Sequence, residues 1–268
     1  MTIHKDICYS EIGSNELHLD VYLPEQTVTP VPVLIWIHGG GWRAGNRGLK
    51  DDMLRPLENG FAMVSASYRL SSEAIFPAQL QDCRTAVRWV RSQAGEYGFD
   101  PDRIGAWGSS AGGHLVALLG VTGATEEFDT AEYAGLSSEV QAVCDWFGPT
   151  DFLRMNDFPG AMDHDAADSP ESQLIGGAIR ENPDLVAAAN PISHISSKTP
   201  PFLIVHGSED RLVPHHQSEL LHAALLEASA DTTLYTVTGG DHGFTGAVKD
   251  TQSSLIEMAI GFFERCLM

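Results

Sequence analysis

The sequence predicts an α/β protein with a mostly parallel central sheet and helices on both faces of that sheet. Short apolar segments typical of strands recur along the 268 residues, and segments with helical spacing lie between several of them. Most of the strand segments are nearly continuous in apolar residues, as expected for strands covered on both faces. The composition, 43% hydrophobic and 19% charged, is that of an ordinary globular protein.

The strand segments can be justified in chain order. Residues 17–23 alternate apolar and polar side chains, which predicts a half-exposed strand near an edge of the sheet. Residues 31–37 and 61–67 are nearly continuous apolar runs and predict buried strands. A turn over residues 100–102 introduces the next buried strand, at 103–108. Further strands are expected at 140–147, 201–207 and 232–237.

The helices follow from periodicity. Residues 77–91 carry apolar side chains at helical spacing, and Pro77 suits the first turn of a helix. Residues 215–228 and 253–266 are interpreted as two further helices, and another is expected to begin directly after residue 110.

Residues 151–191 interrupt this alternation, because the segment is long and rich in turn-forming residues. Within it, residues 157–171 carry five carboxylates and no Lys or Arg. We expect these charges to repel one another and to favour a mobile lid over a packed wall, with Met155, Phe158 and Met162 as apolar contacts for a ligand. A disordered insertion is the alternative interpretation.

Charge and composition exclude several kinds of partner. The chain has 16 basic and 36 acidic residues, a net charge of −20 that repels nucleic-acid phosphates and anionic lipid surfaces. No apolar run approaches the roughly 20 residues needed to cross a bilayer, and the first dozen residues lack a secretory signal. The four scattered cysteines suit buried thiols in a reducing compartment. We therefore expect a cytoplasmic protein in which residues 1–268 form one domain, with 151–191 as a small cap or lid; nothing indicates its oligomeric state.

The first motif that carries chemistry is GSSAG at residues 108–112, which fits the pattern G-x-S-x-G. It follows a predicted strand directly and opens a predicted helix, so Ser110 would lie on a sharp turn with strained backbone geometry. Only glycine at positions 108 and 112 would avoid clashes there. We predict that Ser110 is a nucleophile, that Ser109 is structural, and that the helix N-terminus favours an oxyanion. A merely glycine-rich turn is the alternative.

The second motif is HGGGW at residues 38–42, after the predicted strand 31–37. Glycines allow backbone N–H groups to approach a ligand closely. The N–H groups of Gly40 and Gly41, together with that of Ala111, are therefore candidates for an oxyanion hole around a tetrahedral intermediate. On its own the motif is equally consistent with a flexible turn.

A serine hydroxyl needs a base to remove its proton, and the base needs a carboxylate to fix its tautomer. His242 stands out among the 11 histidines because it lies in a loop after the last predicted strand. Asp210 follows the predicted strand 201–207 and is the favoured acid, with Glu209 as runner-up. Asp241, adjacent to the base in sequence, is less favourably placed.

The other histidines are given structural roles. His206 is expected to be hydrogen-bonded at a strand end, and His215, His216 and His222 to form a solvated helix face. No complete metal-ligand spacing appears, so we predict no metal and no cofactor. Four aromatic residues adjoin the site motifs and are predicted either to line an apolar substrate pocket or to pack in the core: Trp42, Trp146, Phe147 and Phe244.

Because of these motifs and their order, the chain resembles the α/β-hydrolase superfamily. More narrowly, it resembles the HGGG-bearing esterase branch of hormone-sensitive-lipase-like and bacterial feruloyl- or acetyl-esterase-like proteins. The resemblance spans about residues 15–265 and includes the segments SYRL at 67–70, FPA at 76–78, DPDRI at 100–104 and WFGPTD at 146–151. It implies an α/β-hydrolase fold, a triad of Ser110, Asp210 and His242, and oxyanion donors at Gly40, Gly41 and Ala111.

Substrate expectations follow from the resemblance and from one departure. Only 37 residues precede His38, which leaves little room for the helical cap that many hormone-sensitive-lipase-like enzymes carry there. We therefore expect a serine carboxylesterase for small-molecule substrates, namely short-acyl or aryl esters, including acetyl or feruloyl groups on sugars. A small amidase, an arylformamidase or a peptidase would share the triad. A non-catalytic ligand-binding protein of the same fold is the alternative from another class.

Overall fold

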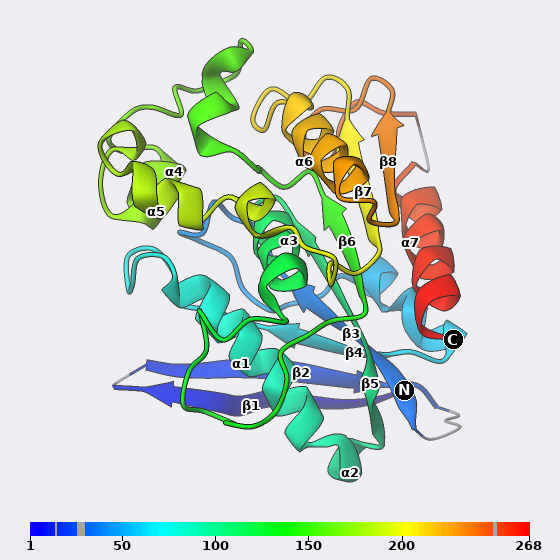
Figure 1. Ribbon diagram of the computed structural model, residues 1–268. Coiled ribbons are helices and arrows are strands. Elements are labelled where there is room, and N and C mark those ends of the chain that lie inside the picture. The colour runs from blue at the N-terminus through cyan, green and yellow to red at the C-terminus, as the bar shows by residue number, and fades with distance from the viewer. Residues whose placement is uncertain (14, 26–29, 249–250) are drawn as a thin grey trace.

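Eight strands form one twisted sheet within the residues that the computed structural model describes, 1–13, 15–25, 30–248 and 251–268 (Figure 1). The spatial order is β1-β2-β4-β3-β5-β6-β7-β8. The first two pairings, β1 with β2 and β2 with β4, are antiparallel, and all others are parallel. The strands are β1 (Thr2–Ile12), β2 (Asn15–Leu23), β3 (Val31–Ile37), β4 (Ala62–Ala66), β5 (Phe99–Ser109), β6 (Ala142–Trp146), β7 (Phe202–Gly207) and β8 (Thr232–Val237).

Helices cover both faces of the sheet, as the sequence predicts. The α-helices are α1 (Ala78–Ser92), α2 (Ala94–Tyr97), α3 (Ala111–Thr122), α4 (Pro170–Ile175), α5 (Pro183–Ala188), α6 (His216–Glu227) and α7 (Thr251–Leu267). The 3-10 turns are η1 (Asp51–Asn59), η2 (Phe152–Asp157), η3 (Ile179–Glu181), η4 (Pro191–His194) and η5 (His242–Phe244). The expected mostly parallel sheet with helices on both faces is therefore confirmed.

Alternation along the buried strands divides the core into two layers. In β3, Val33 and Ile35 belong to the layer that contains residues of α1, α3 and α6, whereas Leu34 and Trp36 belong to the layer under η1 and α7. Every residue of β3 is buried, which explains why the strand has a continuous apolar run rather than an alternating one. Each such aliphatic side chain contributes roughly 1.5–3 kcal/mol when it is fully buried.

One strand was not predicted. β1 pairs antiparallel with β2 and occupies the sheet edge, so residues 17–23 form a strand one position further in than expected. Most of the first six residues of the chain are exposed, and register shifts between His4 and Ile7 and between Cys8 and Ser10 interrupt the pairing. An exposed, irregular strand carries no clean apolar alternation, which is why sequence patterning does not reveal it.

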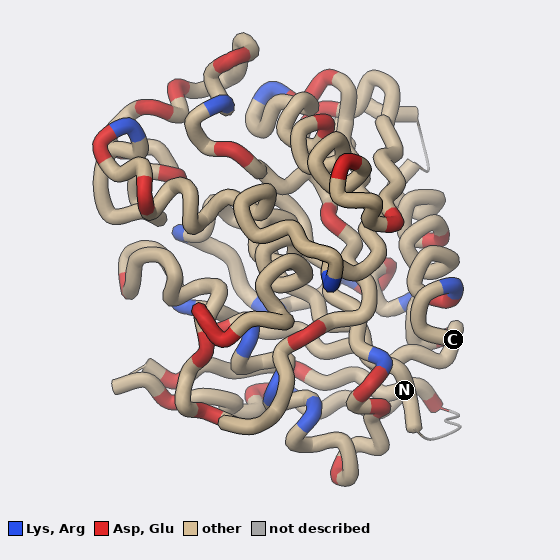
Figure 2. The backbone as a smooth tube through the Cα atoms, viewed as in Figure 1, with Lys and Arg blue, Asp and Glu red and all other residues tan. Residues whose placement is uncertain are grey.

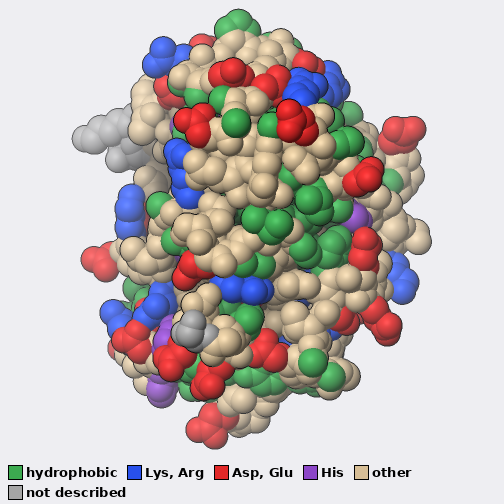
Figure 3. Space-filling view, turned by 90° about the vertical axis from the view of Figure 1, so that its left-hand side faces the viewer, with side chains coloured by type: hydrophobic (Ala, Val, Ile, Leu, Met, Phe, Trp, Pro, Cys, Tyr) green, Lys and Arg blue, Asp and Glu red, His purple; other side chains and the backbone are tan. Residues whose placement is uncertain are grey.

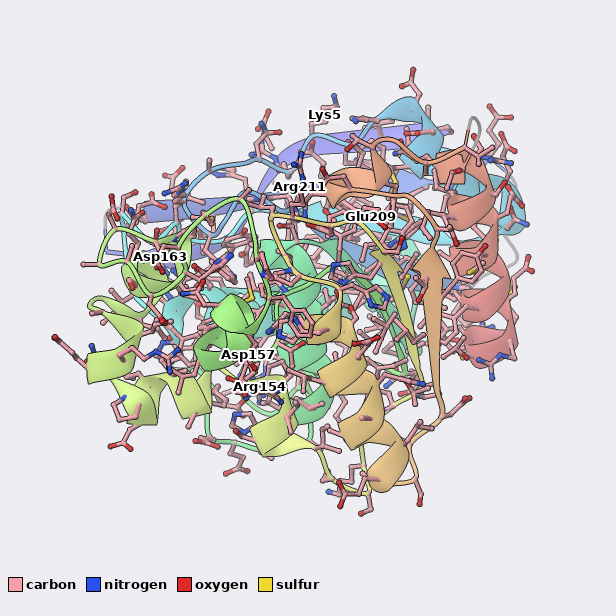
Figure 4. The ribbon with its side chains drawn as sticks, turned by 90° about the horizontal axis from the view of Figure 1, so that it is seen from above. Lys5, Arg154, Asp157, Asp163, Glu209 and Arg211 are labelled. Carbon is pink, nitrogen blue, oxygen red and sulfur yellow. The ribbon has the colours of Figure 1, made fainter. Side chains whose placement is uncertain are left out.

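The segment 151–191 forms the green to yellow-green lobe in Figure 1 and contains η2, α4, η3 and α5. The prediction of five carboxylates without a basic partner is wrong for two of them, Asp157 and Asp165. Asp157 pairs with Arg154 at 2.8 Å (Figure 4). Asp165 pairs with Arg180 at 2.9 Å, and both basic partners lie outside residues 157–171. Several apolar side chains of the segment are almost completely buried, among them Leu174, Ile175 and Ile179, so this part is a packed wall rather than an unpacked lid.

The acidic excess is distributed along the chain rather than gathered in one patch (Figure 2). On the side seen in Figure 3, hydrophobic side chains gather in a band with charged side chains above and below it. None of the helices in the described ranges combines the length and apolarity that crossing a bilayer requires. All four cysteines are free, and Cys83 and Cys144 are buried as expected, but Cys8 is exposed.

Candidate active site

Ser110 occupies a sharp turn between β5 and α3. Its backbone has φ +55° and ψ −123°, a conformation that L-residues rarely adopt and that costs about 1–3 kcal/mol. Two backbone hydrogen bonds hold it: the Ser110 N–H donates to the Trp146 carbonyl at 2.8 Å, and the Ser110 carbonyl accepts from the His114 N–H at 3.0 Å. The surrounding structure thus fixes the serine in a strained position at the end of a strand.

The two glycines of the motif are required by close backbone approach. A Cβ on Gly108 would lie 2.3 Å from the Gly112 carbonyl oxygen, and a Cβ on Gly112 would lie 2.1 Å from the Ile37 carbonyl oxygen. Both distances are far below a van der Waals contact. The expectation that only glycine fits at these two positions is confirmed.

Three side chains from three different loops form a continuous hydrogen-bonded chain. The Ser110 hydroxyl lies 3.1 Å from His242 Nε2, and His242 Nδ1 lies 2.8 Å from Asp210 Oδ2. With the ring proton on Nδ1, His242 donates to the carboxylate and accepts from the serine. Asp210 follows β7 and His242 follows β8, so the structure brings together all three residues predicted from the motifs.

The Asp210 carboxylate receives hydrogen bonds on both oxygens. Oδ1 accepts from the N–H groups of Leu212 at 2.9 Å and Val213 at 2.8 Å. Oδ2 lies 3.3 Å from His206 Nε2, in addition to its bond with His242. Burial raises the pKa of Asp210, but hydrogen bonds from His206 and His242 outweigh burial and hold it well below the ordinary value. The acid therefore remains ionised.

His206 is the residue whose contact with the acid the sequence did not reveal. It is completely buried, and its Nδ1 accepts from the Ser218 hydroxyl at 2.6 Å, which leaves the ring proton on Nε2. That proton is shared between the Val213 carbonyl at 2.8 Å and Asp210. The predicted hydrogen-bonded role is confirmed, and the signal for the further contact was the position of His206 four residues before Asp210 at a strand end.

The alternative acids lie elsewhere. Glu209 is exposed on the loop after β7 (Figure 4). Asp241 accepts from the backbone N–H groups of Arg211 at 3.0 Å and His242 at 2.8 Å, so it shapes the loop rather than contacting the imidazole. Neither carboxylate is hydrogen-bonded to the His242 ring in the described part of the chain.

The expectation of a solvated face for three histidines is wrong for one of them. His215 and His222 are partly exposed, but His216 is buried: its Nε2 donates to the Arg154 carbonyl at 2.7 Å, and its ring lies 4.3 Å from that of Phe158. The segment 151–191 folds over this end of α6, which sequence patterning did not show. Among the described residues, no group of three His, Cys, Asp or Glu side chains is arranged to hold a metal ion.

The glycine-rich loop after β3 lies against the serine turn. A Cβ on Gly39 would be 2.8 Å from the Ser109 carbonyl oxygen, and Gly40 and Gly41 have φ values of +118° and +60°, which favour glycine. The hydrogen bonds of the described residues make no use of the N–H groups of Gly40, Gly41 or Ala111. These three donors are available to a ligand next to Ser110.

A cavity of about 430 Å³ opens at Ser110 and His242. Of the four aromatic residues considered as pocket candidates, Trp42 and Phe147 line the cavity, whereas Trp146 and Phe244 do not. The pocket interpretation is wrong for the latter pair, because their rings pack against each other at 5.3 Å in the core layer under α7. Phe147 lies with its ring 4.8 Å from that of His242. Of the three apolar residues proposed in 151–191, only Met162 lines the cavity; Met155 is buried and Phe158 is exposed.

The strand order, the strained serine between a strand and a helix, and the chain order Ser110, Asp210, His242 are those of the α/β-hydrolase fold. Within this class, the model of the BD-FAE family matches residues 19–225. The chain belongs to the BD-FAE family.

Relatives and solved structures agree with this assignment. A truncated carbohydrate esterase from gut microbiota superposes with a TM-score of 0.88 at 36% identity, over 99% of this chain and 96% of that one. Thermogutta terrifontis esterase 2 with bound propionate gives a TM-score of 0.77 at 25% identity, covering 97% and 93%. The probable carboxylic ester hydrolase LipM of Mycobacterium tuberculosis is 34% identical over 86% of this chain and 53% of its own length. The chain thus spans about half the length of the curated relatives it matches.

Proposed function

We propose that this protein is a serine carboxylesterase that hydrolyses short-acyl or aryl esters, including acetyl or aromatic acyl groups carried by carbohydrates. One observation carries the proposal: the hydrogen-bonded chain from Ser110 through His242 to Asp210 opens into a cavity that also contains unused backbone donors. The relatives are named as esterases and carboxylic ester hydrolases, which supports the same class of reaction.

The mechanism follows from the geometry. Ser110 Oγ attacks the ester carbonyl carbon while His242 Nε2 takes the hydroxyl proton. The ionised Asp210 stabilises the imidazolium that forms, and the N–H groups of Gly40, Gly41 and Ala111 stabilise the oxyanion. His242 then donates its proton to the departing alcohol. Water attacks the acyl-enzyme with the same histidine as base and releases the acid.

The size of the cavity supports small substrates. A volume of about 430 Å³ lies in the lower part of the range found for small-molecule sites, roughly 300–1,000 Å³. Phe147, Met162 and Leu212 give its wall an apolar part that suits an acyl or aryl group. The carbohydrate arm of the proposal is supported by the name of the gut carbohydrate esterase.

The experiment is a substrate panel with the purified protein: p-nitrophenyl esters from acetate to palmitate, methyl ferulate, acetylated xylan and p-nitroacetanilide. We expect the highest kcat/KM for short or aryl acyl groups, a fall of at least tenfold towards palmitate, and slow anilide cleavage. Faster cleavage of the anilide than of p-nitrophenyl acetate would identify an amidase instead. No turnover of any ester would favour a ligand-binding protein.

A further inference from the structure

A buried polar pair lies in the wall of the same cavity. His164 Nδ1 and Glu171 Oε1 are 3.0 Å apart, the two side chains are only 2% and 4% exposed, and both residues line the cavity. The pair comes entirely from the segment 151–191, with His164 before α4 and Glu171 in its first turn. Neither residue belongs to the hydrogen-bonded chain of Ser110, His242 and Asp210, so the proposed mechanism does not use this pair.

Each member of the pair has a polar atom without a partner. His164 Nε2 and Glu171 Oε2 are both buried and make no hydrogen bond. With the ring proton on Nδ1, His164 donates a hydrogen bond to Glu171 Oε1, so that its Nε2 can accept one, as can Glu171 Oε2. Buried polar atoms without partners are unfavourable, and most such atoms in folded proteins are satisfied by protein, water or ligand. His164 Nε2 and Glu171 Oε2 are therefore available to a hydrogen-bond donor of a ligand.

The pair lies close to the reacting centre and is held in place. A Cβ on Gly41 would be 3.3 Å from Cβ of Pro170, so the residue before Glu171 packs against the glycine loop. The Ser169 hydroxyl accepts from the Ser172 N–H at 3.0 Å and caps α4. The His164 N–H donates to the Asn156 side chain at 3.0 Å. These contacts position the pair on a supported part of the cavity wall.

We propose that His164 and Glu171 form a subsite that binds a hydroxyl group of the ester substrate. The inference rests on the proposed esterase function and adds to it the group that the cavity selects. Glu171 lines the cavity and its terminal torsion is broad, so Oε2 can turn towards a ligand there. An apolar ligand would leave both acceptors unpaired, whereas a hydroxyl group donates to one of them.

The charge around the cavity favours a neutral donor. Arg43 is exposed and also lines the cavity, and its guanidinium has no ion-pair partner among the described residues. Its positive charge works against a cationic group such as an ammonium in this cavity. A neutral hydroxyl therefore fits better, and it can belong to the alcohol or to the acyl part of the ester.

Two matched substrate pairs distinguish these sources. Cyclohexyl acetate and trans-2-hydroxycyclohexyl acetate differ by one hydroxyl on the alcohol side. Ethyl butyrate and ethyl 3-hydroxybutyrate differ by one hydroxyl on the acyl side. We expect the wild-type kcat/KM to be at least tenfold higher for the hydroxylated ester in one of the two pairs.

Two variants test the residues. In His164→Phe/Glu171→Met both acceptors are replaced by apolar groups of similar size, and the kcat/KM ratio of hydroxylated to deoxy ester should fall towards one. Glu171→Gln keeps the volume and a partner for His164 Nδ1 but removes the charged acceptor, so it should lower the same ratio at least threefold. Asp165→Asn, which breaks an ion pair with Arg180 in the same segment, is the control and should leave the ratio unchanged.

The outcomes distinguish a failure of the subsite proposal from a failure of the esterase proposal. Turnover of p-nitrophenyl acetate measures the esterase function. A wild-type ratio near one in both pairs overturns the subsite while the esterase function stands. An unchanged ratio in Glu171→Gln does the same, even if the double variant fails to fold. Absence of ester turnover with every substrate overturns the esterase function and the subsite together.

Discussion

At the scale of single residues, the site depends on the hydrogen bonds that the buried carboxylate of Asp210 accepts. Four donors surround Asp210: two backbone N–H groups on Oδ1 and two histidines on Oδ2. Because all of them favour the charged form, the acid can stabilise His242 as an imidazolium without taking its proton. The three side chains of the proposed triad converge although Ser110 and His242 are 132 residues apart in sequence.

Removal of the Asp210 carboxylate should therefore lower kcat strongly, whereas removal of the neighbouring Glu209 carboxylate should not. Asp210→Asn should lower kcat by about 10³–10⁴-fold, because the amide favours the wrong tautomer of His242. Glu209→Gln is the matched control and should stay within about twofold, because the exposed side chain does not touch the imidazole. Steady-state kinetics on p-nitrophenyl acetate measures both. A larger loss in Glu209→Gln would mean that the acid is misassigned.

His206 should act as a positioning residue for Asp210. His206→Phe fills the volume but removes the donor at Nε2, so kcat should fall about tenfold, or about 1.4 kcal/mol in the transition state. KM should change little, because His206 does not line the cavity. His206→Gln retains an N–H donor near the Nε2 position and should recover most of the loss. Wild-type kcat in a folded His206→Phe protein would show that the contact has no effect on catalysis.

The sequence predicts the reacting residues well and their surroundings poorly. Ser110, Asp210 and His242 follow from motif and strand order alone, because each lies just after a strand. The aromatic residues of the pocket do not follow from the sequence. Trp146 and Phe244 are adjacent to the site motifs in sequence but pack in the core layer under η1 and α7. The polar pair of His164 and Glu171 depends on the fold of residues 151–191, for which no periodic pattern exists.

At the scale of secondary-structure elements, the close approach of β3, β5 and α3 at the serine turn holds the site together. Gly112→Ala would place a Cβ 2.1 Å from the Ile37 carbonyl oxygen, so the variant should lose about 1–3 kcal/mol of stability and most of its activity. Gly261→Ala in α7 is the control, because its Cβ would meet nothing within 4 Å and should stabilise by about 0.5–1 kcal/mol. Denaturant unfolding measures both changes. Equal effects of the two substitutions would contradict the close approach.

Most elements were predictable, including the mostly exposed edge strand β8, but β1 and the segment 151–191 were not. The strands from β3 to β7 and the helices α1, α6 and α7 show clear apolar runs or helical periodicity, and the structure confirms them within a few residues. β1 is largely exposed and irregular, so its hydrogen bonds leave no trace in the pattern. The carboxylates of residues 157–171 look unpaired in that stretch alone, because the basic partners Arg154 and Arg180 lie outside it.

At the scale of the whole molecule, one buried charge should make stability depend on pH. Burial raises the pKa of Asp145, in β6, from 3.8 to about 6. The folded protein then binds more protons at this group than the unfolded chain between these two values, so its contribution to stability falls as pH rises through that window and stays low above it.

Asp145→Asn should remove this effect. The amide oxygen can still accept from the Gly148 N–H, which lies 2.9 Å from Oδ1 in the wild type. At pH 8 the variant should be more stable than the wild type by on the order of 2–3 kcal/mol, from a shift of about 2 pH units. Denaturant unfolding at pH 5 and pH 8 should show a smaller difference at pH 5. A difference independent of pH would contradict the assignment of the charge to Asp145.

Covalent labelling can show whether Ser110 is the nucleophile of an ester hydrolase. The wild type and Ser110→Ala are treated with a fluorophosphonate, and intact-mass and peptide mass spectrometry locate the adduct while p-nitrophenyl acetate turnover is followed. In the wild type we predict one adduct, on Ser110, and a loss of turnover in proportion to labelling. Folded Ser110→Ala should form no adduct and should have lost nearly all turnover. An adduct on another residue, or a Ser110→Ala protein that hydrolyses the ester at close to the wild-type rate, would contradict this assignment of the nucleophile.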